Sequence, residues 1–377
     1  MIDRLPTQQL LKRLDDPKCL ILIGPRQVGK TTLLHQLLEP MAEPVLWWNG
    51  DDSDIRSLLA SPTSTQLKQW IGNKQFLVID EAQRIENIGL CIKLIVDNLP
   101  GVKVIATGSS ALELANSINE PLTGRKWEYQ LFPLSYEEMA NHTSAMEERR
   151  LLEHRIIHGY YPDAINNPGD EREILKLLSD SYLYKDILIW HHVQKPAQLE
   201  RLVQALAFQI GNEVTYHELG QMCSLDNQTV ERYINLLEKA FIVYRLGSLS
   251  RNLRNELKKS RKIYFYDNGL RNAVINNFAP LNLRDDTGAL WENFLITERL
   301  KNLHNHRLHA NRFFWRTQAQ QEVDYVEESD GRFLAVEFKW GLNRKARIPK
   351  PFLNAYPGSE TMIVTPDNFE QFLNTGC

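Results

Sequence analysis

One short motif near the N-terminus constrains the fold more than any other feature, because a strand-like segment precedes it and a helix-like segment follows it. Gly24-Pro25-Arg26-Gln27-Val28-Gly29-Lys30-Thr31 follows the apolar run CLILI and precedes TTLLHQLL, which has helical spacing. The pattern G-x-x-x-x-G-K-[ST] between a strand and a helix is typical of a phosphate-binding loop. Its glycines let backbone N–H groups turn inward, and the start of the helix adds its dipole. A turn that only joins strand to helix is the competing interpretation, which Lys30-Thr31 disfavours.

The chemistry of this loop predicts a nucleotide, ATP, with Mg²⁺. We expect Lys30 to reach the β- and γ-phosphates and to act in catalysis, and the Thr31 hydroxyl to hold the metal. The predicted nucleotide-binding residues are Gly24, Pro25, Arg26, Gln27, Val28, Gly29, Lys30, Thr31, Thr32 and Ser109.

A second buried strand, Phe76–Ile79, ends in the carboxylate pair Asp80-Glu81. Asp80 is expected to hold magnesium through water, and Glu81 to polarise the attacking water as the catalytic base. The pair therefore predicts hydrolysis as well as binding. The competing interpretation is a carboxylate pair that caps the following helix.

The next strand, Val104–Thr107, ends close to further polar residues. Thr107, Ser109 and Ser110 are expected to touch the γ-phosphate or to orient the water. Arg125 follows, and we predict that it neutralises charge at the γ-phosphate, from its own chain or from a neighbour in a homo-oligomer. A surface arginine beside a turn is the alternative.

The chain alternates short apolar runs with helical patterns from Cys19 to about Ser110, which predicts a parallel α/β sheet. Strand-like runs stop after Leu131. The segment from Ser135 to Tyr184 reads as helices, and we interpret it as a helical lid or connector.

Several of these segments resemble one known family. GPRQVGKTTLL, VIDEAQRI, ATGSSALEL and LTGRKWEYQLFPLSYEE are similar to AAA-type ATPases of bacteria and archaea that carry a C-terminal domain of unknown function. Gly159–Pro162 and Tyr184-Lys185-Asp186 also match, with Lys185 where that family usually has Arg. The resemblance implies an ATPase core followed by a winged helix and a nuclease-like fold. It implies no established biological role.

The middle of the chain has helix-turn-helix character. Thr215 is placed to cap the helix YHELGQMC, Ser224–Asp226 makes a turn, and a second helix runs from Asn227 to Lys239. Spacing puts Val230, Ile234 and Leu237 on one face of that helix. The residues left outward are Gln228, Arg232, Asn235 and Lys239, whose side chains are suited to bases and phosphates.

A basic run follows, with seven basic residues and one acidic residue between Arg245 and Lys262. Together with the outward helix face it predicts DNA as a partner, since net charge alone does not exclude a local patch. The predicted DNA-binding residues are Gln228, Arg232, Asn235, Arg251, Arg254, Lys258 and Lys259. A protein-protein spacer with a solvated charged face is an equally weighted alternative.

The C-terminal segment predicts a helix over Trp291–Glu298 and a hairpin of Glu322–Val326 with Ala335–Trp340 across Asp330-Gly331. Alternation puts Glu337 and Lys339 on one face. Asp324, Glu337 and Lys339 form a D…E-x-K set that resembles the PD-(D/E)XK nuclease superfamily.

That resemblance implies a second metal site and a nuclease. Asp324 and Glu337 would share Mg²⁺ or Mn²⁺, with Glu292 as the candidate helix carboxylate, while Lys339 would steady the attacking oxygen. The competing interpretation is a half-exposed hairpin with an ordinary polar face, so nuclease activity stays open.

Composition bounds the remaining choices. With 377 residues the chain exceeds what one hydrophobic core usually serves. We predict an ATPase core at 1–135, a helical connector at 136–197, a winged helix at 198–266 and a restriction-endonuclease-like α/β module at 267–377. Four scattered cysteines and the absence of any long apolar run favour the cytoplasm and no membrane contact.

Two functions from different classes fit this organisation. The favoured one is an ATP-hydrolysing protein that acts on DNA through its winged helix and nuclease-like domain. The alternative is a nucleotide-gated signalling or scaffold ATPase whose C-terminal modules bind protein and are not catalytic. A small-molecule kinase is disfavoured, because Glu81 beside Asp80 suits hydrolysis.

Overall fold

The computed structural model describes residues 2–41, 44–109, 121–181, 195–249, 261–341 and 346–374. The chain divides into two compact units, one of residues 1–133 and 239–241 and one of residues 134–238 and 242–377. Each unit is built around its own β-sheet.

A parallel five-stranded sheet forms the centre of the first unit, in the order β2-β3-β4-β1-β5. Its strands are β1 Cys19–Ile23, β2 Val45–Asn49, β3 Phe76–Asp80, β4 Lys103–Gly108 and β5 Lys126–Gln130. The first four are the predicted strands, and β5 is one that the sequence pattern did not single out. Strand β4 lies between β1 and β3, so the loop after β1 and the carboxylates after β3 meet across one intervening strand.

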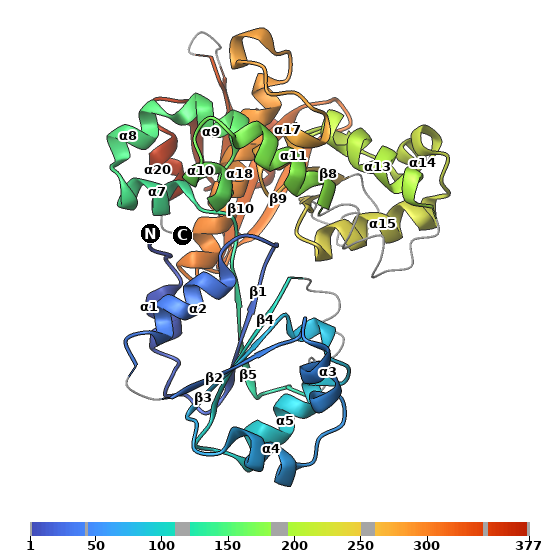
Figure 1. The fold of residues 1–377 in the computed structure, drawn as a ribbon. Coiled ribbons are helices and arrows are strands. Elements are labelled where there is room, and N and C mark those ends of the chain that lie inside the picture. Colours follow the sequence, from blue (N-terminus) through green and yellow to red (C-terminus); the bar gives the residue numbers. More distant parts are fainter. Residues whose placement is uncertain are drawn as a thin grey trace. The chain divides into compact units, whose positions relative to one another are not determined.

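Helices cover this sheet, which is why β1 and β4 are buried along their whole length. Figure 1 shows α1 and α2 on one side of the sheet and α4 and α5 on the other. The helices of the unit are α1 Thr7–Leu11, α2 Lys30–Leu38, α3 Ser53–Leu59, α4 Ser64–Ile71 and α5 Ile88–Asn98, with the 3₁₀ helix η1 Ala82–Arg84.

The second unit opens with the predicted run of helices. They are α7 Tyr136–His142, α8 Ala145–Arg150, α9 Leu152–His158, α10 Pro162–Asn166 and α11 Glu171–Ser181. Helices α9 and α11 pack on α17 Asn268–Val274, and α9 also packs on α18 Thr287–Asn305. The backbone N–H of Tyr160 donates to buried Asp267 over 2.7 Å, and the Asn268 amide donates to the Ile156 carbonyl over 3.0 Å. Residues 184–186, singled out above, lie outside the described residues.

The middle of the second unit follows the predicted helix-turn-helix order. It contains α13 Pro196–Phe208, β6 Glu213–Val214, α14 Tyr216–Cys223, α15 Asn227–Lys239, β7 Val243–Ser248 and β8 Arg261–Phe265. Figure 1 shows α13, α14 and α15 gathered beside β8. The predicted apolar face of α15 is confirmed, since Val230, Ile234 and Leu237 are fully buried.

A mixed seven-stranded sheet runs through the whole second unit, in the order β12-β11-β10-β9-β7-β8-β6. Its C-terminal strands are β9 Asn311–Arg316, β10 Glu322–Ser329, β11 Arg332–Phe338 and β12 Glu360–Val364. The elements that complete the unit are η3 Leu281–Leu283, α19 Lys350–Ala355 and α20 Phe369–Asn374.

Two details of this sheet bear on the predicted sites. The β10–β11 hairpin is confirmed, and its turn residues Asp330 and Gly331 both have positive φ, as a tight two-residue turn requires. Strand β7 pairs in parallel with β9, through Gly247↔Phe313 and Ser248↔Phe314. This pairing merges two segments that the sequence suggested as separate modules into one sheet.

Candidate functional site

The predicted phosphate-binding loop lies between β1 and α2. Gly29 has φ of 89°, a left-handed conformation that glycine adopts without strain. The Lys30 ammonium is buried and donates to the carbonyls of Gly24 and Pro25 over 2.9 and 2.7 Å. The positive charge of Lys30 is therefore held inside the loop, next to the start of α2, where an anion is favoured.

The other predicted loop residues lie along the same segment. Val28 is fully buried, so only its backbone can face a phosphate. Gln27 has a positive φ of 58°, which fits the tight course of the loop. Thr31 and Thr32 stand in the first turn of α2.

Arg4 is a loop-supporting residue that the sequence did not reveal. Its guanidinium is buried and donates to the Val28 carbonyl over 2.7 Å and to the Phe132 carbonyl over 2.7 Å. These bonds join the loop to the segment after β5. No local pattern indicates them, because Arg4 and Phe132 are far apart in the sequence.

Asp80 lies at the end of β3 between two hydroxyl groups. The Thr31 hydroxyl donates to one Asp80 oxygen over 2.9 Å, and the Thr107 hydroxyl donates to the other. The two residues predicted to hold magnesium at the nucleotide, Thr31 and Asp80, are thus in contact. A hydroxyl and a carboxylate are the oxygen ligands that this ion takes beside a nucleotide.

Glu81 is held separately from Asp80. The Gln83 amide donates to Glu81 Oε2 over 2.6 Å and to Ser109 Oγ over 2.9 Å, and the Ser109 hydroxyl donates to the same Glu81 oxygen over 3.2 Å. Ser109, predicted to meet the nucleotide, therefore contacts the predicted base. Gln83 was missed, although it stands two residues after Glu81 in the segment VIDEAQRI.

Gly50, which follows β2, lies directly against the backbone of Asp80 and Glu81. A Cβ on Gly50 would lie 2.3 Å from the Glu81 carbonyl oxygen, which no real contact allows. The backbone N–H of Gly50 also donates to the Asp80 carbonyl over 2.8 Å. Only glycine permits β2 to meet the Asp80-Glu81 backbone at this distance.

The position of Arg125 favours the second of its two predicted roles, action on a neighbouring chain's nucleotide, over action on the nucleotide of its own chain. Arg125 precedes β5, and its neighbour Lys126 pairs with Cys19, the first residue of β1. The phosphate-binding loop follows the last residue of β1, about 16 Å away at the usual rise of a strand. The Arg125 guanidinium instead pairs with Asp97, with 2.7 Å between Nε and Oδ1.

The predicted acidic residues of the second unit do approach one another. Asp324 on β10 accepts a 2.8 Å bond from the backbone N–H of Phe338 on β11. Lys339 Nζ lies 2.6 Å from Glu337 Oε1, while Glu337 Oε2 is buried with no hydrogen-bond partner. Burial and the nearby negative charges of Glu292 and Glu337 raise the pKa of Asp324.

Glu292, predicted as a third metal ligand, is engaged by other groups. Its Oε1 accepts from Lys262 Nζ over 2.9 Å and from the Tyr264 hydroxyl over 2.5 Å. Among the described residues, no group of three or more His, Cys, Asp or Glu side chains is arranged to hold a metal ion. The predicted set of Asp324, Glu337 and Glu292 thus does not form a ready three-carboxylate site.

Lys262 is the residue that engages Glu292 in this region. It lies on β8, only 2% exposed, and its Nζ is also 2.5 Å from Glu322 Oε1. Burial alone would lower the Lys262 pKa, but the charges of Glu292, Glu322 and Asp324 raise it above its ordinary value. Lys262 is therefore a charged ammonium inside the acidic cluster.

The predicted DNA-contacting residues have mixed surroundings. Gln228 and Arg232 are exposed on α15. Asn235 is half-buried and accepts a bond from Arg245, whose guanidinium also pairs with Glu238. The remaining predicted contacts, Arg251, Arg254, Lys258 and Lys259, lie outside the described residues.

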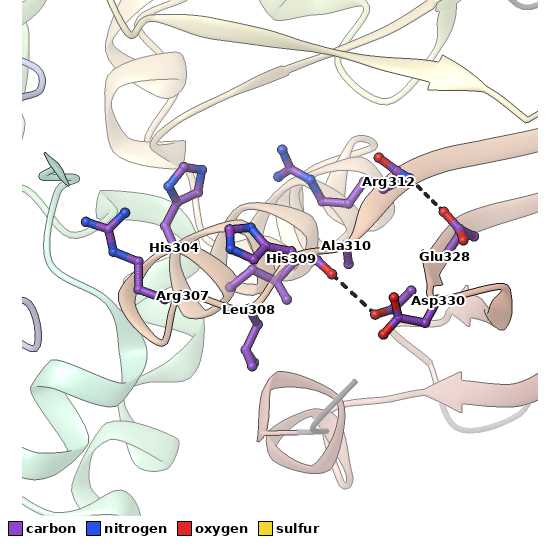
Figure 2. Close-up of a pocket in the computed structure, with 11 residues that line it drawn as sticks. His304, Arg307, Leu308, His309, Ala310, Arg312, Glu328 and Asp330 are labelled. Carbon is purple, nitrogen blue, oxygen red and sulfur yellow. Dashed lines mark hydrogen bonds between the residues drawn. The ribbon is translucent and has the colours of Figure 1, made fainter. Parts of the chain in front are cut away.

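A pocket of about 550 Å³ opens elsewhere in the second unit, between the end of α18 and strands β9 and β10. Figure 2 shows His304, Arg307, His309 and Arg312 at its wall, with Asp330 at the opposite side. It lies at the far end of β10 from Asp324, because it is lined by residues 328–330. None of the predicted site residues lines it.

The described cysteines are buried thiols without disulfide partners. Cys19, Cys91 and Cys223 are buried and free, and burial raises the pKa of the Cys19 and Cys91 thiols to about 12. Within the described ranges, no helix is both long and apolar enough to cross a bilayer.

Three stretches of the chain match known families of protein domains. Residues 16–140 match a family described as an AAA domain. The first unit therefore carries a P-loop ATPase domain of the AAA class, which implies NTP hydrolysis with ATP and Mg²⁺. Residues 149–281 and 287–376 match two domains of unknown function, DUF8612 and DUF4143.

The relatives found are uncharacterised. An uncharacterized protein of Mycobacterium tuberculosis, Rv2008c, is 25% identical over all of this chain and 86% of its own length. One of Haemophilus influenzae is 25% identical over 97% of this chain and 93% of its own length. Among solved structures, a Walker-type ATPase of Pyrococcus abyssi, PABY2304, aligns with a TM-score of 0.50 at 16% identity. It covers 73% of this chain and 96% of its own, and this likeness concerns the fold.

Proposed function

We propose that the first unit hydrolyses ATP with Glu81 as general base. The observation that carries this proposal is the separate support of two adjacent carboxylates: Asp80 by Thr31 and Thr107, and Glu81 by Gln83 and Ser109. One carboxylate is bonded to the Thr31 hydroxyl at the loop, and the other is oriented by groups outside the loop. Such a division of roles suits attack by water on a bound phosphate.

The residues of the loop bind and orient the nucleotide in this proposal. Lys30 would exchange its hydrogen bonds to the loop carbonyls for bonds to phosphate oxygens, and Thr31 and Asp80 would hold the Mg²⁺ that screens phosphate charge. Glu81 accepts the proton of the attacking water, while Gln83 and Ser109 fix its carboxylate in one orientation.

ATP turnover and ATP binding test the proposal together. Glu81→Gln keeps the shape of the side chain, so we expect ATP to bind while turnover falls at least about 100-fold. Lys30→Ala is expected to lose binding as well. Glu86→Gln, an exposed carboxylate nearby, serves as the matched control. Unchanged turnover in Glu81→Gln would remove the base from the proposal.

We also propose a homo-oligomer as the setting in which Arg125 acts. Its partly exposed place at the amino end of β5 supports action on a neighbouring chain's nucleotide, and the pair with Asp97 must open for it. Inactive Lys30→Ala chains mixed with Arg125→Ala chains should regain turnover in hetero-oligomers. No regain, with both variants folded and mixed, would remove Arg125 from catalysis.

For the second unit we propose that a winged helix, α13 to β8, binds duplex DNA. The order of its helices and strands supports this, as do exposed Gln228 and Arg232 on α15. Asn235 contributes by holding Arg245 rather than by reaching a base, since it is already bonded. Arg251, Arg254, Lys258 and Lys259 would supply phosphate contacts.

Salt dependence separates DNA binding from the alternative scaffold function. Binding to labelled duplex should weaken steeply with salt, and charge reversal at Arg254, Lys258 and Lys259 should abolish it. As a single change, Arg232→Ala should weaken DNA binding more than the matched exposed variant Glu231→Ala does. Binding that ignores salt and survives charge reversal would favour protein-binding modules, which the internal pairing of Arg245 and Lys262 also favours.

Metal-dependent cleavage of DNA by a nuclease-like site is a further candidate function of the second unit. The unpartnered, buried Glu337 Oε2 beside Asp324 supports it, because an orphaned carboxylate oxygen is what a divalent ion would satisfy. Nicking of plasmid DNA with Mg²⁺ or Mn²⁺ should disappear in Asp324→Ala. Nicking that persists in Asp324→Ala would show a contaminating activity.

A further inference from the structure

The acidic cluster of the second unit already contains a cation of its own. Four carboxylates, from Glu292, Glu322, Asp324 and Glu337, come from α18, β10 and β11. Lys262 reaches them from β8, a strand that the D…E-x-K pattern does not include. It binds Glu292 and Glu322 directly, over 2.9 and 2.5 Å.

Packing of the surrounding elements fixes Lys262 in this place. Helix α18 lies along β8, where Asn293 exchanges hydrogen bonds with the backbone of Phe265 over 2.8 and 3.0 Å. This places Glu292, one residue earlier, beside Lys262 and Tyr264. The ammonium also lies 5.6 Å from the centre of the buried Phe314 ring on β9. The Lys262 charge therefore has little access to water, and its partners are the carboxylates.

A divalent ion and this ammonium require the same oxygens. Glu292 Oε1 already accepts from two donors, and Glu322 is drawn to Lys262 and lies 3.6 Å from Arg316. A divalent ion at Asp324 and Glu337 would also draw on Glu292 Oε1 and Glu322 Oε1, the two oxygens that Lys262 already holds. Mutual repulsion of two cations in a buried site opposes both being present.

We propose that Lys262 competes with a divalent ion for the acidic cluster, so that the second unit binds the metal tightly only when Lys262 is withdrawn. This inference rests on the proposed nuclease-like site and names the residue that controls its metal affinity. In this proposal Lys262 is a positioning residue, because it acts through the carboxylates of Glu292 and Glu322 that it contacts.

Mn²⁺ binding to the full chain without nucleotide tests this proposal. All proteins carry Asp80→Asn, which removes the carboxylate of the phosphate-loop site. We expect Lys262→Met to bind Mn²⁺ at least about ten-fold more tightly than the parent protein, as loss of a competing charge predicts. The gain should vanish when Asp324→Asn is added. Lys262→Arg, which keeps the positive charge, is the matched control and should bind as weakly as the parent.

Loss of Lys262 leaves buried carboxylates uncompensated, so a second variant guards against misfolding. Lys262→Met with Glu322→Gln removes one negative charge together with the positive one and leaves three carboxylates. Added Mn²⁺ should raise the melting temperature of both variants and leave that of the parent unchanged. Equal Mn²⁺ affinity in the parent and Lys262→Met, or no gain in either variant, would overturn the proposal.

The outcomes also separate this inference from the nuclease proposal. A parent protein that binds Mn²⁺ tightly and nicks DNA through Asp324 would support the nuclease and reject competition by Lys262. Variants that gain an Asp324-dependent Mn²⁺ site but never nick DNA would support competition by Lys262 and reject the nuclease.

Discussion

Single side chains decide whether Glu81 is aimed at an attacking water. Glu81 Oε2 receives bonds from both Gln83 and Ser109, and Gln83 also bonds Ser109, so the three residues form a closed set. The Gln83 amide donates to both of the other residues, so its loss removes two of the three bonds. Catalysis by a base depends on its orientation as well as on its pKa.

Replacement of Gln83 by Ala should therefore lower turnover more than binding. One orienting hydrogen bond contributes about 1 kcal/mol, which corresponds to a fall in kcat of about five- to ten-fold. The KM for ATP should hardly change, since Gln83 does not touch the loop. Steady-state ATP hydrolysis measures both constants. Gln75→Ala, an exposed glutamine just before β3, is the control, and an equal effect of both variants would contradict the prediction.

At the same scale, Asp286 holds two buried arginines in the second unit. Its Oδ2 lies 2.6 Å from Arg271, and its Oδ1 lies 2.8 Å from Arg284 Nε. Burial alone would raise the Asp286 pKa, but these contacts lower it below its ordinary value of 3.8. A carboxyl group whose pKa is lower in the folded state stabilises the fold above its unfolded pKa. The stabilisation is lost as the pH falls through the folded-state pKa.

Asp286→Asn should therefore destabilise the second unit at neutral pH. Leaving two buried guanidinium groups without their carboxylate costs about 3 kcal/mol. The difference from wild type should stay constant between about pH 7 and pH 5 and shrink below about pH 4. Urea unfolding at several pH values measures it, with the exposed neighbour variant Asp285→Asn as control. A difference that grew on acidification would contradict this sign.

At the scale of elements, local sequence patterns predicted where strands occur but not which strands pair in the sheets. β1 to β4 and the β10–β11 hairpin are visible as apolar or alternating runs with a turn at Asp330-Gly331. Strand order is not local: the position of Arg125 depends on β5 pairing with β1, and that of Lys262 depends on β8 joining a sheet with β9 and β10 through β7. The sequence therefore singled out Asp80, Glu81, Asp324 and Glu337 as candidate site residues. It did not reveal that Lys262 lies among the carboxylates of the second unit.

The junction of β2 with β3 is an element-scale feature with a direct test. Gly50→Ala places a methyl group where the Glu81 carbonyl now lies, so the backbone after β3 must move. We expect turnover to fall by at least about ten-fold, because a shift of a fraction of an ångström misplaces the base. ATP affinity should fall little, as β1 and its loop are not touched. Gly101→Ala, which meets no atom within 4 Å, is the matched control.

At the scale of the whole molecule, the helices of residues 136–181 belong structurally with the C-terminal elements. The Asn272 amide donates to the Ile157 carbonyl over 2.7 Å, and buried Lys301 donates to the Leu134 carbonyl over 2.9 Å. The backbone N–H of Tyr136 donates to buried Glu298 over 2.7 Å. These polar groups of α17 and α18 have their partners at Leu134, Tyr136 and Ile157, so buried hydrogen bonds link the segments before and after residue 197.

Truncation tests this organisation. A fragment of residues 134–377 should be soluble and unfold cooperatively, because it keeps every one of these partners. A fragment of residues 198–377 should be aggregated or unfolded, since Asn268, Asn272, Glu298 and Lys301 each lose one buried hydrogen-bond partner, and each loss costs about 1 kcal/mol or more. Circular dichroism and thermal unfolding of the two fragments distinguish the cases. Cooperative unfolding of the shorter fragment with the same midpoint would instead support an independent connector at 136–197, as the sequence alone suggested.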